Sequence, residues 1–151
     1  MAAVPLLPPK HLLLQACRGL PPEDRHPVLR CAGLLADLHE RRLTAAAGAT
    51  GHIDHERARM VLDIDRWVAL ELPKAARDAH LHTETVGTVV DRLAQFSALA
   101  YLTLASAPDE AMHEAATRLT ELALAYEHLA NELAAGRRRL PNLTGNREYE
   151  Y

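Results

Sequence analysis

Apolar residues recur at steps of three and four along most of the chain, which is the spacing of a buried face on an α-helix. The clearest series is Met60, Val61, Ile64, Trp67, Val68 and Leu72. Prolines precede several such stretches and glycines follow them, as is usual at helix starts and ends. We therefore predict five helices, over residues 8–19, 27 to about 46, 54–73, 82–104 and 108–136. The third would be capped by Asp54 and the fourth by His82 or Thr83.

The same pattern indicates the fold. No stretch shows the strict alternation of a half-buried strand, and the connections between predicted helices are short. We expect a single all-α domain, an up-and-down bundle of four to five helices over residues 1–141, followed by an irregular tail over 142–151. Apolar faces on so many helices usually exceed what one small core can hide, so we also expect a homodimer.

Composition argues against several classes of protein. The 17 basic and 20 acidic residues give a net charge of −3, without the basic face that nucleic-acid binding needs. No run approaches the roughly 20 apolar residues of a membrane span, so we expect no membrane partner. The first residues lack the pattern of a signal peptide, and Cys17 and Cys31 have no Cys-x-x-Cys spacing. We therefore expect two reduced thiols in a cytoplasmic protein.

The fourth predicted helix carries a second, polar face. Four of its side chains fall at i, i+4, i+7 and i+11, on one line of the helix: Glu84, Thr88, Asp91 and Gln95. Arg92 lies beside this line, and His80 and His82 precede it. Carboxylates, a hydroxyl and an amide in one row, with these charged neighbours, predict a polar cleft for a small molecule.

Each of these side chains has a possible chemical role. His82, or His80 near it, could pass protons, because histidine exchanges protons near neutral pH. Glu84 or Asp91 could act as a base if burial raised its pKa. Arg92 could hold a carboxylate or phosphate group. The pattern alone favours a structural interpretation, because Glu84 in a first turn suits the helix dipole and Asp91 and Arg92 could pair with charges on a neighbouring helix or face water.

The third predicted helix has a charged stripe of Arg59, Asp63 and Arg66, with Asp65 next to it. Such a stripe is most often solvated. If this stripe faces the fourth helix instead, it would form a buried ion network with Asp91 and Arg92.

Metal and cofactor sites have little support in the sequence. A di-iron site in a helical bundle needs two Glu-x-x-His motifs on helices. Residues 110–113 match this motif in a predicted first turn and residues 23–26 match it in a turn, whereas His39 and His128 are isolated. No glycine-rich loop of the kind that binds phosphates or dinucleotides is present. We therefore predict neither a metal nor a cofactor.

Residues 82–93 read His-Thr-Glu-Thr-Val-Gly-Thr-Val-Val-Asp-Arg-Leu and are followed by Tyr101. This segment resembles the central motif of a bacterial domain-of-unknown-function family, four-two-five-four, in which Thr-Glu-Thr-x-Gly leads into a helical Asp-Arg-Leu. The flanking residues 59–68 and 133–141 resemble a short actinobacterial branch of that family. The motif maps onto Glu84, Thr85, Gly87, Asp91 and Arg92.

The resemblance covers residues 25–141. It implies an all-helical fold and, for this branch, occurrence in actinobacteria, sometimes near genes of specialised metabolism. It implies no established activity. Before Arg59 this chain is rich in alanine and leucine, where larger members of the family are richer in charged and aromatic residues.

Two hypotheses about function follow. The first is a cofactor-independent acid–base tailoring enzyme of cyclase, dehydratase or isomerase type in bacterial specialised metabolism. Its catalytic residues would be His82, Glu84 and Asp91, and its substrate-binding residues would be His80, Thr88, Arg92, Gln95 and Tyr101. The second is a non-catalytic interaction or scaffold module in which Glu84, Asp91 and Arg92 form a structural network. A pocket beside these three side chains favours the enzyme, whereas complete mutual pairing without a cavity favours the scaffold.

Overall fold

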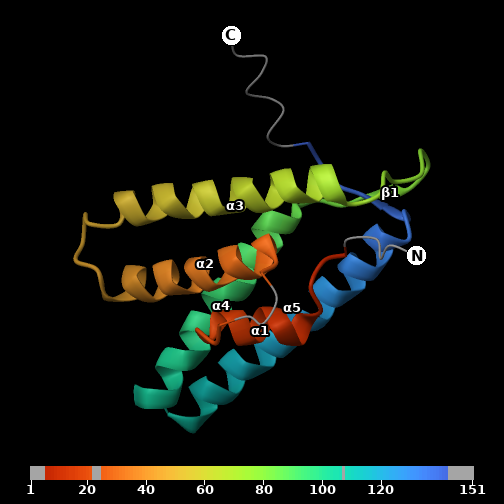
Figure 1. The fold of residues 1–151 in the computed structure, drawn as a ribbon. Helices are drawn as coiled ribbons and strands as arrows, with labels where there is room; N and C mark the ends of the chain where they lie inside the picture. Colours follow the sequence, from red (N-terminus) through yellow and green to blue (C-terminus); the bar gives the residue numbers. More distant parts are fainter. Residues whose placement is uncertain (1–5, 22–24, 107, 143–151) are drawn as a thin grey trace.

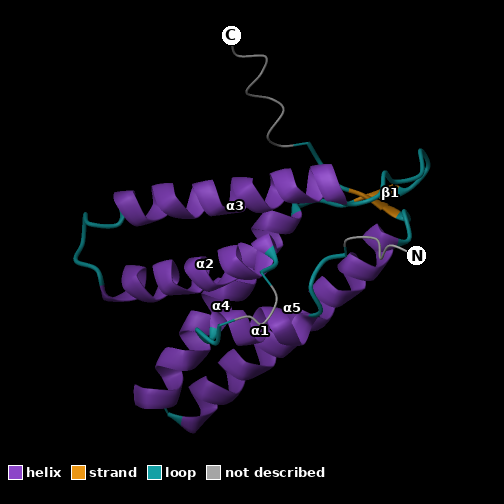
Figure 2. Ribbon diagram, viewed as in Figure 1, coloured by secondary structure: helices purple, strands orange, loops and turns teal. Residues whose placement is uncertain are grey.

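The computed structural model describes residues 6–21, 25–106 and 108–142. These residues form five helices and two very short strands (Figures 1 and 2). In chain order they are α1 (Lys10–Cys17), α2 (Pro27–Thr44), α3 (Gly51–Glu71), β1 (His80–Leu81), α4 (Val86–Ser106), α5 (Asp109–Ala134) and β2 (Arg138–Arg139). The predicted all-α bundle is confirmed. The tail predicted at the end of the chain lies, from residue 143 on, outside the described residues.

Helix α4 is the centre of the arrangement. It packs against α2, α3 and α5, while α1 packs against α2, α4 and α5. In Figure 1, α2 and α3 form one hairpin, and α4 passes behind α2 before α5 returns alongside it as a second hairpin. Side chains on different faces of α4 therefore meet different partner helices, which matters for the site.

Local signals account for most of the helix ends. Pro27 is the first residue of α2, and the Nδ1 atom of His26 accepts a hydrogen bond from the backbone N–H of Val28 as its cap. Pro108 precedes α5. Gly19 and Gly136 follow α1 and α5 with φ angles of 83° and 71°, the left-handed conformation that glycine adopts at little cost.

Two predicted helix starts are wrong. Helix α3 begins at Gly51, so Asp54 lies in its first turn and does not cap it. Helix α4 begins at Val86, because the preceding residues are engaged elsewhere. His80 and Leu81 pair in parallel with Arg138 and Arg139, two strands that the sequence pattern did not predict.

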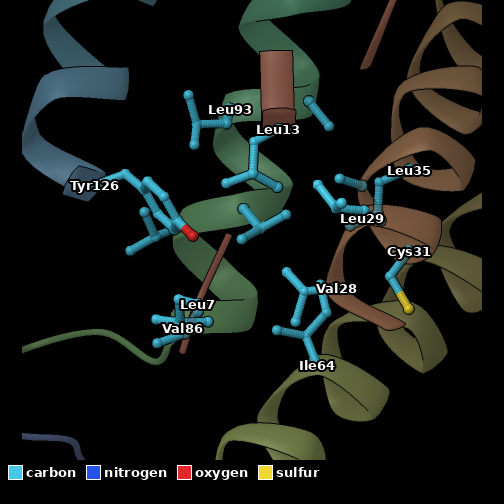
Figure 3. Close-up of a cluster of buried hydrophobic side chains, with 14 of the residues drawn as sticks. Leu7, Leu13, Val28, Leu29, Cys31, Leu35, Ile64, Val86, Leu93 and Tyr126 are labelled. Atoms are coloured by element: carbon cyan, nitrogen blue, oxygen red, sulfur yellow. The ribbon is translucent and has the colours of Figure 1, made fainter. Parts of the chain in front are cut away.

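Aliphatic side chains from every helix meet in one core (Figure 3). The largest fully buried members include Leu13 of α1, Leu29 and Leu35 of α2, Ile64 of α3, Leu93 of α4 and Tyr126 of α5. Each buried leucine or isoleucine contributes about 1.5–3 kcal/mol through removal of apolar surface from water. The hydroxyl of Tyr126 donates a hydrogen bond to the carbonyl oxygen of Pro8 over 2.6 Å, which fixes the N-terminal segment against α5.

Cys17 and Cys31 are buried and free, as expected. Burial raises the pKa of Cys17 to about 12, so this thiol is a packing residue and a poor nucleophile at neutral pH. Among the described residues, no helix combines the length and apolar character needed to cross a bilayer.

Candidate functional site

The start of α4 is held by a carboxylate from α3. The Oδ1 atom of Asp65 accepts a hydrogen bond of 2.7 Å from the backbone N–H of Gly87, and the Asp65 carboxylate accepts another from the Thr85 hydroxyl. Thr85 caps the helix, since its hydroxyl oxygen accepts from the backbone N–H of Thr88 over 3.2 Å. We call Asp65, Thr85 and Gly87 the Asp65 joint. A negative charge at a helix N-terminus also complements the helix dipole.

The Asp65 joint leaves no space between α3 and α4. A Cβ atom on Gly87 would lie 2.4 Å from the carbonyl oxygen of Val61 and 2.7 Å from Oδ1 of Asp65. Only glycine permits this approach, because the nearest atom belongs to the backbone and cannot move aside cheaply. The Thr-x-Gly part of the motif is therefore explained by helix packing.

One turn further along α4, a second carboxylate joins three helices. Asp91 accepts a hydrogen bond of 2.7 Å from Nε2 of His39 on α2, and one of 2.9 Å from Nη2 of Arg57 on α3. Arg57 also donates to Asp54 over 2.9 Å, and Asp54 accepts a further hydrogen bond of 2.9 Å from Nε of Arg42. We call His39, Arg42, Asp54, Arg57 and Asp91 the Asp91 cluster. It is a continuous chain of opposite charges that ends at the imidazole.

The pKa values of Asp65 and Asp91 are shifted in opposite directions. Burial raises the pKa of Asp65, and its hydrogen bonds from Gly87 and Thr85 offset this effect only in part. Burial also acts to raise the pKa of Asp91, but hydrogen bonds from His39 and Arg57, together with their charges, outweigh it and hold that pKa below its ordinary value. A base needs a raised pKa, so Asp91 does not meet the condition under which it was expected to act as one.

A pocket of about 220 Å³ opens beside the Asp91 cluster. Its lining comes from α2, α3 and α4: His39, Arg42, Leu43, Arg57, Gln95 and Leu99. The side chain of His39 is only 4% exposed, so the pocket is the route by which a ligand would reach it. The two acidic members of the cluster, Asp54 and Asp91, bond to residues of this lining and are not part of it.

Glu84 and Arg92 form a separate pair. Both guanidinium Nη atoms of Arg92 donate to the two carboxylate oxygens of Glu84. Glu84 precedes α4, so it does not belong to the line of polar residues that was predicted along this helix. Asp91 and Arg92 are adjacent in sequence but bond to different partners, and the expected unit of Glu84, Asp91 and Arg92 is divided in two.

The two predicted histidines lie before α4. His80 is exposed on β1. His82 donates its backbone N–H to the carbonyl oxygen of Arg139 over 2.7 Å, and its Nδ1 atom lies 2.9 Å from the backbone oxygen and 3.2 Å from the backbone nitrogen of Glu84. Neither residue lines the pocket beside Asp91. They shape the turn that leads into α4.

The remaining predicted ligand-binding residues are scattered. Gln95 lines the pocket beside the Asp91 cluster. The hydroxyl of Thr88 bonds to that of Thr85 over 3.0 Å and belongs to the start of the helix. Tyr101 is 62% exposed and is not among the pocket residues.

Three polar residues of the lining were not predicted from the sequence: His39, Arg42 and Arg57. His39 had a signal, since it follows Leu35 by one helical turn and so continues the buried face of α2 with a polar side chain. On α3 the predicted stripe of Arg59, Asp63 and Arg66 is exposed, as its usual interpretation requires. The polar contacts with α4 come instead from the neighbouring positions Arg57 and Asp65.

Within the described ranges, no group of three or more histidine, cysteine, aspartate or glutamate residues is placed to hold a metal ion. The basic lining of the pocket likewise suits an anion better than a cation.

Comparisons with known proteins place the chain in a family. The family described as "Protein of unknown function (DUF4254)" matches residues 36–142, well over half of the chain, and all five members of the Asp91 cluster lie inside that match. No curated protein matches the chain, and no solved structure does. The chain belongs to the DUF4254 family.

Proposed function

We propose that this protein handles a small molecule in the pocket beside the Asp91 cluster, with His39 as its acid–base group. The observation that carries the proposal is that His39 and Arg57, both held by Asp91, line the same pocket of about 220 Å³. Ligand pockets for drug-sized molecules usually measure roughly 300–1,000 Å³. The proposed ligand is therefore small, or enters with one end only.

The contact between Asp91 and His39 sets the tautomer of the imidazole. An ionised carboxylate can only accept hydrogen bonds, so Nε2 of His39 carries the proton. In the neutral ring Nδ1 is then the basic atom, the one that would take a proton from a ligand and return it. Asp91 would orient the ring and stabilise its protonated form without taking up the proton, which agrees with the lowered pKa of this carboxyl.

The reaction classes expected from the sequence fit this arrangement, with His39 taking the place of His82. A cofactor-independent cyclase, dehydratase or isomerase moves protons and needs one positioned acid–base group. Such a group contributes about 10²- to 10⁴-fold in rate, and positioning by the pocket would supply the rest.

Two experiments test the proposal. Titration of the ¹⁵N-labelled protein with a library of neutral, anionic and cationic fragments should shift amide signals of pocket residues. Gln95→Trp, which fills the pocket, should abolish those shifts, whereas the matched variant Gln15→Trp on the exposed side of α1 should keep them. Shifts that are absent, or that survive Gln95→Trp, would contradict the pocket.

The acid–base role has its own test. A fragment that binds and carries a C–H bond next to a carbonyl group should exchange that hydrogen in D₂O in the presence of the wild-type protein. His39→Gln should lose the exchange and still bind the fragment. Exchange that is the same in both proteins would remove the acid–base role and leave a binding protein.

One observation favours a second function, the scaffold module. Glu84 and Arg92 pair with each other, so this part of the motif is already satisfied within the chain. Large side chains also stay exposed on α3 and α4, with Leu70 82%, Tyr101 62% and Leu104 66% exposed. These exposed side chains support the expected homodimer. We further propose that the protein is cytoplasmic and belongs to bacterial specialised metabolism. Light scattering would measure the mass, and Tyr101→Ser with Leu104→Ser should leave a monomer.

A further inference from the structure

The geometry of the pocket points to its ligand class: a small carboxylate with a short aliphatic body, bound end-on by the guanidinium of Arg42. This inference rests on the proposed function and adds the chemistry of the ligand. It follows from the signs of the charges that face the pocket, from the hydrogen-bonding atoms in use, and from the apolar side chains opposite.

The charged groups that line the pocket are cationic. Arg42 and Arg57 face it, and their acidic partners Asp54 and Asp91 are not in the lining. The lining therefore presents positive charge to a ligand, although the four charges together sum to zero. An anion in the pocket would meet two guanidinium groups and no carboxylate of the lining.

The two arginines are engaged to different degrees. Arg57 uses Nε and Nη2 for Asp91 and Nη1 for Asp54, and only 24% of its side chain is exposed. Arg42 is 45% exposed and bonds Asp54 through Nε. In the hydrogen bonds formed among the described residues, the two Nη groups of Arg42 are not used. Two parallel N–H groups match the two oxygens of a carboxylate.

Asp54 makes Arg42 a prepared anchor. Its Oδ1 atom accepts from Arg42 and from Arg57, each over 2.9 Å, and so fixes the two guanidinium groups relative to each other. A ligand that binds the outer edge of Arg42 would not need to displace Asp54. Less side-chain freedom is then lost on binding.

The rest of the lining sets the body of the ligand. Leu43 and Leu99 give an apolar wall, and the amide of Gln95 adds a neutral polar group beside the imidazole of His39. A volume of 220 Å³ has room for roughly seven water molecules at about 30 Å³ each. A carboxylate with a branched chain of a few carbons fits that volume and that wall.

The test compares three probes of one shape: 4-methylpentanoate, its amide and the corresponding amine. Two-dimensional ¹H–¹⁵N spectra should show the carboxylate shifting the Nε–H signals of Arg42 and Arg57 and the amides near Gln95. The amide should bind about tenfold more weakly, because it cannot form the charged paired contact, and the amine should not bind.

Variants of neighbouring arginines assign the anchor. Arg42→Gln should weaken carboxylate binding about tenfold. Arg42→Lys, which keeps the charge and loses the fork, should fall between. Arg41→Gln should change nothing, since Arg41 is exposed and pairs with Asp37 on the surface.

The outcomes separate the ligand class from the pocket itself. Equal or tighter binding of the amide or amine at the same residues, or an Arg42→Gln variant that binds as well as wild type, would overturn the carboxylate inference and keep the proposed function. If the fragment library also fails to shift the pocket residues, the proposed function falls with it.

Discussion

The Asp65 joint and the Asp91 cluster are two solutions to one problem, how to place an aspartate between packed helices. Asp65 is satisfied by a backbone N–H and a hydroxyl, at a contact so close that only glycine fits. Asp91 is satisfied by an imidazole and a guanidinium, next to a pocket. The pKa of the first is raised and that of the second is lowered.

The difference shows how a structural polar contact can be distinguished from a candidate site. Neutral donors compensate part of the cost of burying a carboxylate, as at Asp65, and need no open space. Cationic partners with long side chains require space between the helices. Here that space is the pocket lined by Arg42 and Arg57. Both aspartates lie in helices that the family match includes, so membership in the family alone does not separate them.

The largest expected effect comes from a change that disrupts the Asp65 joint. Gly87→Ala places a methyl group 2.4 Å from a backbone oxygen of α3, so the two helices must separate. We expect a loss of about 3 kcal/mol in the free energy of unfolding, measured with urea. Gly51→Ala, where a Cβ meets nothing within 4 Å, should stay near wild type. Equal stability of the two variants would show that α3 and α4 are less tightly packed than described.

The next largest effect is expected in the Asp91 cluster. Asp91→Asn removes the negative charge that His39 and Arg57 share, and we expect a loss of about 2 kcal/mol in the free energy of unfolding. The matched control is Asp37→Asn, because Asp37 forms an exposed ion pair with Arg41. This change should cost about 0.5 kcal/mol or less. A larger loss of stability in Asp37→Asn than in Asp91→Asn would contradict the view that the Asp91 cluster joins the helices.

The pH dependence should sharpen the comparison, because the two carboxylates act with opposite sign. The folded-state pKa of Asp91 lies below its unfolded value near 3.9, so its contribution to stability is present above that value and is lost as the pH falls through the folded pKa. The folded pKa of Asp65 is raised, so its contribution is complete below the unfolded value and is lost as the pH rises through the folded pKa.

Urea unfolding between pH 3 and pH 7 measures both effects. The stability of wild type relative to Asp91→Asn should increase with pH over the lower part of this range. Relative to Asp65→Asn it should decrease with rising pH. Two differences that slope in the same direction would contradict the assignment of neutral donors to one site and cations to the other.

The smallest effect belongs to the pair outside both sites. Glu84→Gln removes the charge that Arg92 binds, but the Arg92 side chain is 43% exposed and solvent screens the pair. We expect a loss of about 0.5 kcal/mol in the free energy of unfolding and no change in fragment binding. A loss larger than that of Asp91→Asn would return the centre of the site to the pair of Glu84 and Arg92.

Sequence reasoning succeeds where the signals are local. Pro27, Pro108, Gly19 and Gly136 mark helix ends by their own backbone preferences, and these limits agree with the structure. The start of α4 was misplaced because it depends on distant residues. Its first turn is held by Asp65, and the residues before it pair with β2.

The candidate site was only half predictable for a similar reason. Asp91 and Gln95 were found because they share one face of one helix. Adjacent residues on a helix differ in direction by about 100°, so Asp91 and Arg92 could not act as one group. The partners of Asp91 come from α2 and α3, and no spacing along the chain connects His39 or Arg57 with it.

The family match begins at residue 36, partway along α2. The earlier part of that helix, with Val28 and Leu29, and the whole of α1 lie before this point, yet their side chains are in the same core as Tyr126 and Leu93. The segment that matches the family thus contains only part of the hydrophobic core of this protein. A fragment cut at the family boundary would keep every residue of the Asp91 cluster and lose the apolar side chains of α1 and early α2, so binding studies need these two helices as well.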